Sequence, residues 1–325
     1  MEIKVIENTV YGLFLSFLIL EDKKNITYIF PSDFNKIILD KMYKKKKKII
    51  LSSLGTFKSG IFKHYLNLVK YKLKKPDKNI KVYGNDHTYI SIPYWKNEFY
   101  LIEDGTLNYT FFYKRKKSIK EKIKRIIKLL PSDKKCYGLR ENIKKIYLTG
   151  VGPIPKEIYH KVEIIDLKEL WNKKNLEEQN EILDIFSFDL NIKEKIKGRN
   201  IILFTQPLSE DSVITEEEKL KIYLEIIKKY PKERLVIKTH PREKTDYKNI
   251  FQECLVLDNP FPFEILKLLD VEFNKAVTLF STAALGLGKE VEIDFYGTEV
   301  HMKILERFGS CDNIMKRNCF LKEER

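Results

Sequence analysis

The feature that most constrains this fold is the alternation of short β-branched or aromatic runs with stretches of helical pattern. Twelve such runs occur along the chain, at residues 3–6, 26–30, 48–54, 80–83, 99–102, 145–149, 162–166, 200–205, 234–238, 254–257, 276–280 and 291–296. Strands that alternate with helices pair in parallel, because a parallel pair needs a crossover connection long enough to hold a helix. The pattern therefore predicts an α/β protein with parallel sheets covered by helices.

The runs fall into two series that are separated by a long polar stretch. Residues 167–197 have helical composition and end at Gly198, which is typical of a turn or a helix terminus. A chain of 325 residues is long enough for two domains of ordinary size. We expect a GT-B-like pair of doubly wound, Rossmann-type lobes, one over 1–190 and one over 191–325, facing across a cleft at the carboxyl ends of their strands.

The chain has a strong positive excess. Lys and Arg number 61 against 46 Asp and Glu, which gives a formal net charge of +15. This favours an anionic partner, although an AT-rich genome would also encode a chain this rich in Lys, Ile and Asn. Basic runs at 44–48 and 114–117, and the basic face of a helix predicted over 118–130, leave two interpretations open: a solvated face, or a surface that docks on anionic lipid.

Several common chemistries lack their motifs. The sequence has no P-loop, no G-x-G-x-x-G after a strand, no H-E-x-x-H and no EF-hand loop. A metal-binding D-x-D loop is missing too, since the nearest match, E-I-D at 292–294, falls inside an apparent strand. The four cysteines, at 136, 254, 311 and 319, form no C-x-x-C pair. Neither a zinc site nor a disulfide framework is indicated, and a reducing cytoplasm is expected.

The apolar run at 10–20 is the one candidate for a targeting or membrane segment. It is too short to span a bilayer, and it lacks the basic flank and cleavage site of a signal peptide. We therefore expect the first buried helix of the first lobe there.

Polar residues stand where two of the predicted strands end. One strand runs into E-D-G at 103–105, which places Asp104 at a carboxyl edge, where a carboxylate can act as a base. Another runs into T-H-P-R-E at 239–243, which places His240 at the edge of the second sheet between two cations. The second arrangement suits a phosphate group.

Two further motifs follow in the second lobe. P-F-P-F-E at 260–264 opens a helix, and S-T-A-A at 281–284 follows a strand, so that hydroxyls and free N–H groups meet at a helix start. Taken singly, each motif is a common turn or helix cap. Their order along the chain, each at a strand end or a helix start, favours a phosphate-containing ligand in the second lobe and a general base in the first.

In these motifs the sequence resembles the bacterial sialyltransferases of the two-lobed GT-B type, and most closely glycosyltransferase family 52, the lipooligosaccharide sialyltransferases. The likeness lies in EDG at 103–105, HP within IKTHPRE at 237–243, FPFE at 261–264, FSTAA at 280–284 and FTQPLSED at 204–211. It spans the second lobe well, whereas over residues 1–98 it consists of length and fold pattern only.

The resemblance implies catalytic roles for three residues. Asp104 matches the general base proposed in related sialyltransferases, which takes the proton of the acceptor hydroxyl, and Asp211 is the alternative base. His240 matches the histidine at the leaving phosphate of CMP.

Donor-binding roles are implied in the same way. Lys238 lies where related enzymes contact the cytidine, and Pro241 completes the His-Pro motif. Glu264 resembles the carboxylate that holds the ribose hydroxyls, while Ser281 and Thr282 resemble the hydroxyl pair on the phosphate.

The implied function is a cytoplasmic, inverting transfer of N-acetylneuraminic acid from CMP-Neu5Ac to a terminal galactose, in α2,3 linkage, on lipooligosaccharide or a related surface glycan. No cofactor or metal is expected, because CMP leaves as a single phosphate with a second pKa of about 6, which a histidine, hydroxyls and a helix terminus can stabilise. Peripheral contact with the inner membrane and a homodimer are further expectations.

Two alternatives remain open on the residues alone. One is a transferase of the same fold that uses a UDP-hexose or CMP-Kdo as donor. The other is a basic nucleic-acid-binding protein, for which the sequence has charge and interleaved aromatic residues but no recognised signature.

Overall fold

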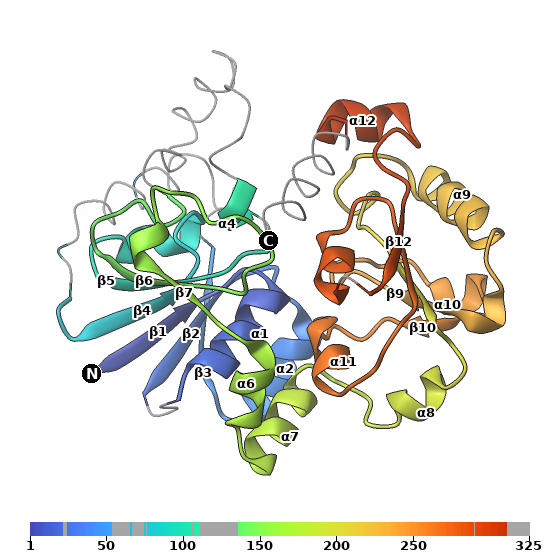
Figure 1. Ribbon diagram of the computed structural model, residues 1–325. Coiled ribbons are helices and arrows are strands. Elements are labelled where there is room, and N and C mark those ends of the chain that lie inside the picture. The colour runs from blue at the N-terminus through green and yellow to red at the C-terminus, as the bar shows by residue number, and fades with distance from the viewer. Residues whose placement is uncertain are drawn as a thin grey trace. The chain divides into compact units, whose positions relative to one another are not determined.

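The computed structural model describes residues 1–21, 25–53, 66, 75, 77–105, 107–110, 136–288 and 290–310. The chain divides into two compact units, Met1–Ile185 and Phe186–Arg325, and each is built on one parallel sheet (Figure 1). The sequence pattern had placed the boundary near residue 190. The basic run at 114–117, the helix expected over 118–130 and the cysteines at 311 and 319 lie outside the described residues.

The described part of the first unit forms a seven-stranded sheet in the order β3-β2-β1-β4-β5-β6-β7, with every neighbouring pair parallel. Its elements are β1 (Glu2–Ile6), α1 (Val10–Ile19), β2 (Ile26–Pro31), α2 (Lys36–Lys44), β3 (Lys48–Ser52), β4 (Ile80–Gly84), the 3-10 helix η2 (Tyr89–Tyr94), β5 (Glu98–Ile102), α4 (Leu107–Thr110), β6 (Ile143–Leu148), the 3-10 helix η5 (Tyr159–Lys161), β7 (Val162–Ile164), α6 (Leu167–Asn172) and α7 (Leu176–Ile185).

The second unit has a five-stranded sheet among its described residues, in the order β10-β9-β8-β11-β12, again parallel throughout. Its elements are α8 (Ile192–Ile196), β8 (Ile201–Phe204), α9 (Glu216–Ile227), the 3-10 helix η6 (Lys232–Arg234), β9 (Leu235–Lys238), α10 (Tyr247–Ile250), β10 (Leu255–Leu257), α11 (Glu264–Leu268), β11 (Lys275–Thr278), the 3-10 helix η7 (Thr282–Leu287), β12 (Glu292–Phe295) and α12 (Met302–Phe308).

The sequence pattern located the strands well. Each of the twelve β-branched or aromatic runs overlaps an observed strand, and the apolar run at 10–20 forms α1. The central strands are apolar at successive positions because helices cover both faces of the sheet; β2, β8 and β9 illustrate this, with almost every residue buried. The prediction of an α/β fold with two parallel, doubly wound sheets is confirmed.

Helix α9 shows how one sequence segment builds the second core. Thr215 and Glu218 form a reciprocal capping box at its start, which gives partners to backbone N–H groups that a helix leaves free. Its buried face, including Tyr223 and Ile226, packs on side chains of the central strands such as Leu203. Figure 1 shows α9 and α10 on one side of this sheet and α11 on the other.

Both sheets reverse their strand order beside the first strand. In the first unit the reversal lies between β1 and β4, and in the second unit between β8 and β11. Ligands of open α/β sheets bind outside the carboxyl ends of the strands at such a switch point. The residues that follow β1, β4 and β5, and those that follow β8, β9 and β11, therefore lie where a ligand site is expected.

Part of the lysine run at 44–48 is paired within the first unit. Lys45 Nζ lies 3.1 Å from Asp184, and Lys47 Nζ lies 2.7 Å from Glu181 on α7. These two lysines thus join α2 and its following turn to α7. Among the helices of the described segments, none combines the length and the apolar character that crossing a bilayer requires.

Candidate active site

His240 follows β9 at the carboxyl edge of the second sheet, as predicted. Its backbone N–H donates to Glu243 Oε2 at 2.8 Å, and its Nδ1 accepts a hydrogen bond from the backbone N–H of Arg242 at 3.2 Å. Because Nδ1 is used as an acceptor, the proton of the neutral imidazole lies on Nε2. The loop therefore fixes the tautomer that offers an Nε2–H donor.

The electrostatic setting of His240 favours the neutral ring. Burial, and then the positive charges of Arg242 and Lys238, lower the pKa of His240 to about 4. The ring is therefore uncharged at neutral pH, because burial and its positive neighbours both disfavour a second proton. Such a group can donate a hydrogen bond to a phosphate, and an arriving anion raises its pKa toward protonation.

A buried carboxylate, that of Glu243, holds the loop in place. Its side chain is 1% exposed, and it accepts hydrogen bonds from the hydroxyls of Thr205, which follows β8, and Tyr247, at 2.9 Å for the latter. Burial raises the pKa of Glu243, and the Thr205 hydroxyl and other donors lower it. Glu243 thus ties the ends of β8 and β9 to α10.

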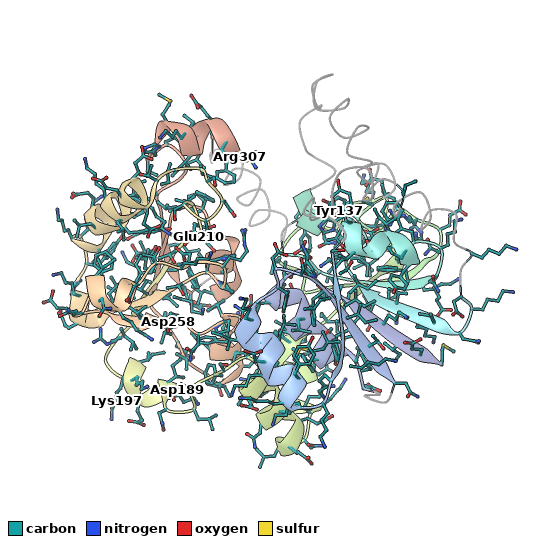
Figure 2. All side chains as sticks on the ribbon, turned by 180° about the vertical axis from the view of Figure 1, so that it is seen from behind. Tyr137, Asp189, Lys197, Glu210, Asp258 and Arg307 are labelled. Atoms are coloured by element: carbon teal, nitrogen blue, oxygen red, sulfur yellow. The ribbon has the colours of Figure 1, made fainter. Side chains whose placement is uncertain are left out.

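Lys219 supports this carboxylate from α9. Its side chain is fully buried, and Nζ lies 3.8 Å from Glu243, 3.0 Å from Glu216 and 3.0 Å from Glu210. Glu210, labelled in Figure 2, also accepts from the backbone N–H of Lys244 at 2.7 Å. Neither Lys219 nor Glu243 is predicted from the sequence, although Glu243 is the last residue of the IKTHPRE motif.

Lys238 is buried, with an exposed fraction of 4%. Its Nζ donates to the carbonyl oxygens of Thr239 at 3.0 Å and Asn259 at 3.2 Å, and lies 4.4 Å from the centroid of the Phe261 ring. Burial lowers its pKa to about 8. In this position Lys238 anchors the segment that leads to Glu264, the first residue of α11.

The other predicted donor-binding residues also lie near this edge of the sheet. Pro241 follows His240 directly. Ser281 precedes η7 and its backbone N–H donates to Thr278 Oγ1, at the end of β11, over 2.9 Å. Thr282 is the first residue of η7, and its side chain lies outside the described part of the structure.

Asp211 is held by the His240 loop. Its two carboxylate oxygens pair with the guanidinium group of Arg242, Oδ1 with Nη1 at 2.5 Å and Oδ2 with Nη2 at 3.0 Å. Such a two-point ion pair is geometrically specific. The structure thus brings Asp211 to the same loop as His240 and engages both of its carboxylate oxygens.

Asp104 follows β5 in the first unit and has a different partner. Its Oδ2 lies 3.2 Å from Nε2 of His87, and its backbone N–H donates to Asn108 Oδ1 at 2.7 Å. The backbone turns at Gly105, whose φ is +53°, a conformation that favours glycine. Asp104 and His87 are both mostly buried, with side chains 12% and 17% exposed.

His87 is a further site residue that the sequence motifs do not predict. Its ring stacks on that of Tyr137, with centroids 4.7 Å apart and planes at 15°. Tyr137, labelled in Figure 2, donates its backbone N–H to the buried Asp86 at 2.8 Å. The sequence signal for it is the polar run G-N-D-H at 84–87, which follows a predicted strand directly, as EDG does.

Glu103, the other acid of the EDG motif, has a structural role. It accepts from the hydroxyls of Tyr11 at 3.0 Å and Tyr109 at 2.6 Å, and from the backbone N–H of Thr149 at 2.6 Å. It therefore links α1, α4 and the end of β6.

Within the described residues no group of three His, Cys, Asp or Glu side chains could hold a metal, and metal independence of the reaction stays a prediction.

Two parallel Rossmann-type sheets, with polar side chains at the carboxyl edge of each, are the architecture of GT-B glycosyltransferases. The family model of glycosyltransferase family 52 matches residues 16–304. The chain belongs to that family.

One relative and two solved structures are similar to this chain over most of its length. An uncharacterized protein of Haemophilus influenzae is 39% identical over 303 residues, which cover 92% of this chain and 95% of that protein. The α/β-galactoside α-2,3-sialyltransferase of Photobacterium phosphoreum has a TM-score of 0.56 at 16% identity, over 98% of this chain and 96% of that one.

The 2,6-sialyltransferase of Photobacterium sp. JT-ISH-224, solved with CMP and lactose, has a TM-score of 0.57 at 13% identity, over 100% of this chain and 77% of that one. At these identities the two structures establish the shared fold. Identities of 16% and 13% do not extend the ligands of those two enzymes to this chain.

Proposed function

We propose that this chain is a sialyltransferase that transfers N-acetylneuraminic acid from CMP-Neu5Ac to a terminal galactose of lipooligosaccharide or a related surface glycan, in α2,3 linkage. Membership of family 52 supports the transfer of a glycosyl group. The similar folds of an α-2,3-sialyltransferase, and of a 2,6-sialyltransferase solved with CMP and lactose, support the donor and the sugar acceptor. A cytoplasmic enzyme with peripheral membrane contact, acting as a homodimer, is part of the same proposal.

The environment of His240 supports this proposal most directly. A neutral imidazole with its proton on Nε2 lies at the carboxyl edge of the second sheet, beside Arg242 and Lys238. A hydrogen-bond donor in positive surroundings suits a nucleoside monophosphate leaving group, whose charge grows as its bond to the sugar breaks. The phosphate is held better in the transition state than in the ground state, which is what catalysis requires.

The proposed reaction is a single displacement at the anomeric carbon. The acceptor hydroxyl oxygen forms a bond to that carbon while the bond to the CMP phosphate oxygen breaks. The electron pair of the broken bond leaves on CMP, where the Nε2–H of His240 stabilises it, and the hydroxyl proton passes to the carboxylate of Asp104. One base and one leaving-group donor suffice for inversion.

Asp104 suits the base better than Asp211 on the contacts of the two groups. The guanidinium group of Arg242 engages both carboxylate oxygens of Asp211. Asp104 has a histidine partner on Oδ2 and a neutral amide on its backbone N–H. A base must have an oxygen available to take a proton, which favours Asp104.

A nucleotide panel tests the donor. Thermal unfolding should be measured with CMP, CDP, UMP and UDP, with EDTA present. CMP should raise the melting temperature, because a ligand that binds only the folded state stabilises it by about 2.7 kcal/mol at a hundredfold excess over its Kd. His240→Ala should reduce the CMP shift, while His160→Ala, at an exposed position of the first unit, should keep it.

Other outcomes of the panel point to the alternatives. Stabilisation by UMP or UDP alone would contradict the proposal and indicate a UDP-hexose donor. Stabilisation by CMP, with turnover of CMP-Kdo in place of CMP-Neu5Ac, would correct the sugar. A shift with none of the nucleotides, together with salt-sensitive binding of nucleic acid, would replace the enzyme with a binding protein.

A further inference from the structure

Two buried polar side chains meet at the switch point of the first sheet, and the proposed reaction uses neither. Glu7 follows β1 and is 0% exposed, and Asn85 follows β4 and is 1% exposed. Nδ2 of Asn85 donates to Glu7 Oε2 at 2.8 Å and, through its other N–H, to Asn8 Oδ1 at 3.3 Å. Both N–H groups of the amide are thereby used.

One oxygen on each side chain is left without a partner. Glu7 Oε1 and Asn85 Oδ1 are both buried, and neither has a hydrogen-bond partner in the described structure. Both atoms are acceptors when Glu7 is ionised, so neither can satisfy the other. Buried polar atoms are almost always paired. A proton on Glu7 Oε1 would turn that oxygen into a donor, and Asn85, whose Nδ2 already bonds to Glu7 Oε2, carries an acceptor oxygen without a partner.

The chain is built closely around this carboxyl group. A Cβ atom at Gly12, in the first turn of α1, would lie 2.1 Å from Glu7 Oε2, and one at Gly84 would lie 3.1 Å from Glu7 Oε1. Gly84 also has a φ of +125°. Gly12 thus leaves the space that the carboxyl group fills, whereas a Cβ at Gly84 would first meet the backbone oxygen of Ile6, at 2.0 Å.

We propose that Glu7 is a protonated carboxylic acid in the folded protein, and that it forms a two-bond pair with the amide of Asn85. In this pair Asn85 Nδ2 donates to Glu7 Oε2, and the Glu7 hydroxyl donates to Asn85 Oδ1. The pair joins the carboxyl ends of β1 and β4 and is uncharged.

The surrounding charges favour the neutral form. Burial raises the pKa of Glu7 well above its ordinary value, and the negative charge of Asp104 raises it further, while the hydrogen bond from Asn85 lowers it. Asp104 is itself paired with His87. Gly12 of α1, Gly84 of β4 and Asn85, which follows β4, lie against the carboxyl group, and none of the three carries a charge.

A neutral Glu7 has two consequences for the first unit. The start of α1, where a Rossmann-type sheet can hold a phosphate, is already filled by a side chain. A neutral Glu7 also adds no second negative charge beside Asp104. The second consequence rests on the proposed function of Asp104, and it makes Glu7 a positioning residue for that base.

Infrared difference spectroscopy on the protein without substrate tests the protonation directly. The spectrum of the wild type at pH 7 should contain a carbonyl band of a protonated carboxylic acid that Glu7→Gln removes and Asp104→Asn retains. The absence of any such difference between wild type and Glu7→Gln would overturn the proposal. Because no substrate is present, the result does not depend on whether the chain is a sialyltransferase.

The pH dependence of unfolding gives a second readout. A carboxyl group whose pKa is raised on folding stabilises the fold below its unfolded pKa, and this contribution is lost as the pH rises through the folded value. Glu7→Gln, which keeps a neutral pair with Asn85, should fold and should gain stability over the wild type as the pH is raised from 6 to 9. A variant that is unfolded, or that loses stability relative to wild type over this range, would contradict a neutral Glu7.

Discussion

The functional character of His240 comes from its backbone neighbours as much as from the ring itself. The N–H of Arg242 fixes the tautomer, and Glu243 fixes the backbone of the same turn. Both contacts are made within three residues of the histidine, so the local sequence T-H-P-R-E supplies the groups that bond directly to the ring and to its backbone. The remaining support, from Thr205, Tyr247 and Lys219, comes from other elements.

The roles of the two candidate bases can be separated by substitution. Asp104→Ala and His240→Ala should each lower turnover by at least about 10², the lower range for acid–base groups, whereas Asp211→Ala should have a smaller effect. Steady-state rates with CMP-Neu5Ac and lactose measure this, and circular dichroism checks that each variant is folded. Near-normal turnover of Asp104→Ala, with a large loss in Asp211→Ala, would transfer the base to Asp211.

Some residues of the candidate site can be predicted from the sequence, and others cannot. Asp104 and His240 were found because each follows a clear strand and lies in a recognisable motif. Glu7 and His87 also follow strands, but they look like ordinary turn residues until the strand order brings their neighbours together. The partnership of Asp211 with Arg242 joins residues 31 positions apart, which spacing alone could not predict.

At the level of elements, α9 does more than cover the second sheet. Its buried face carries Lys219, which lies among three carboxylates from separate parts of the unit. The sequence pattern predicts the helix, but it does not predict that Lys219 is buried, because lysine is usually exposed unless it is paired. Burial of its charge depends on the tertiary positions of those acids.

Removing this buried charge should weaken the second unit. Lys219→Met should lower the free energy of unfolding by about 3–5 kcal/mol, because it leaves buried carboxylates without their cation. Lys221→Met, at an exposed position of the same helix, should change it by less than about 0.5 kcal/mol. Urea unfolding compares the two. Equal stability of both variants would show that the Lys219 cluster contributes little.

For the whole molecule, the sequence predicted the fold class and the number of sheets but left the strand order open. Periodicity reports which face of a segment is buried, whereas strand order is set by which crossovers pack together. Both sheets adopt the same kind of order, with a reversal beside their first strand. This repetition places the strand-end motifs of each unit at an edge suited to ligands.

The proposed CMP-sialic acid transferase must release CMP whenever it transfers its sugar. The most direct test is the release of CMP from CMP-N-acetylneuraminate, with EDTA present and with lactose added or withheld. We expect release that lactose stimulates and EDTA leaves unchanged. No release under either condition, with no stabilisation of the fold by CMP, would contradict the proposed function.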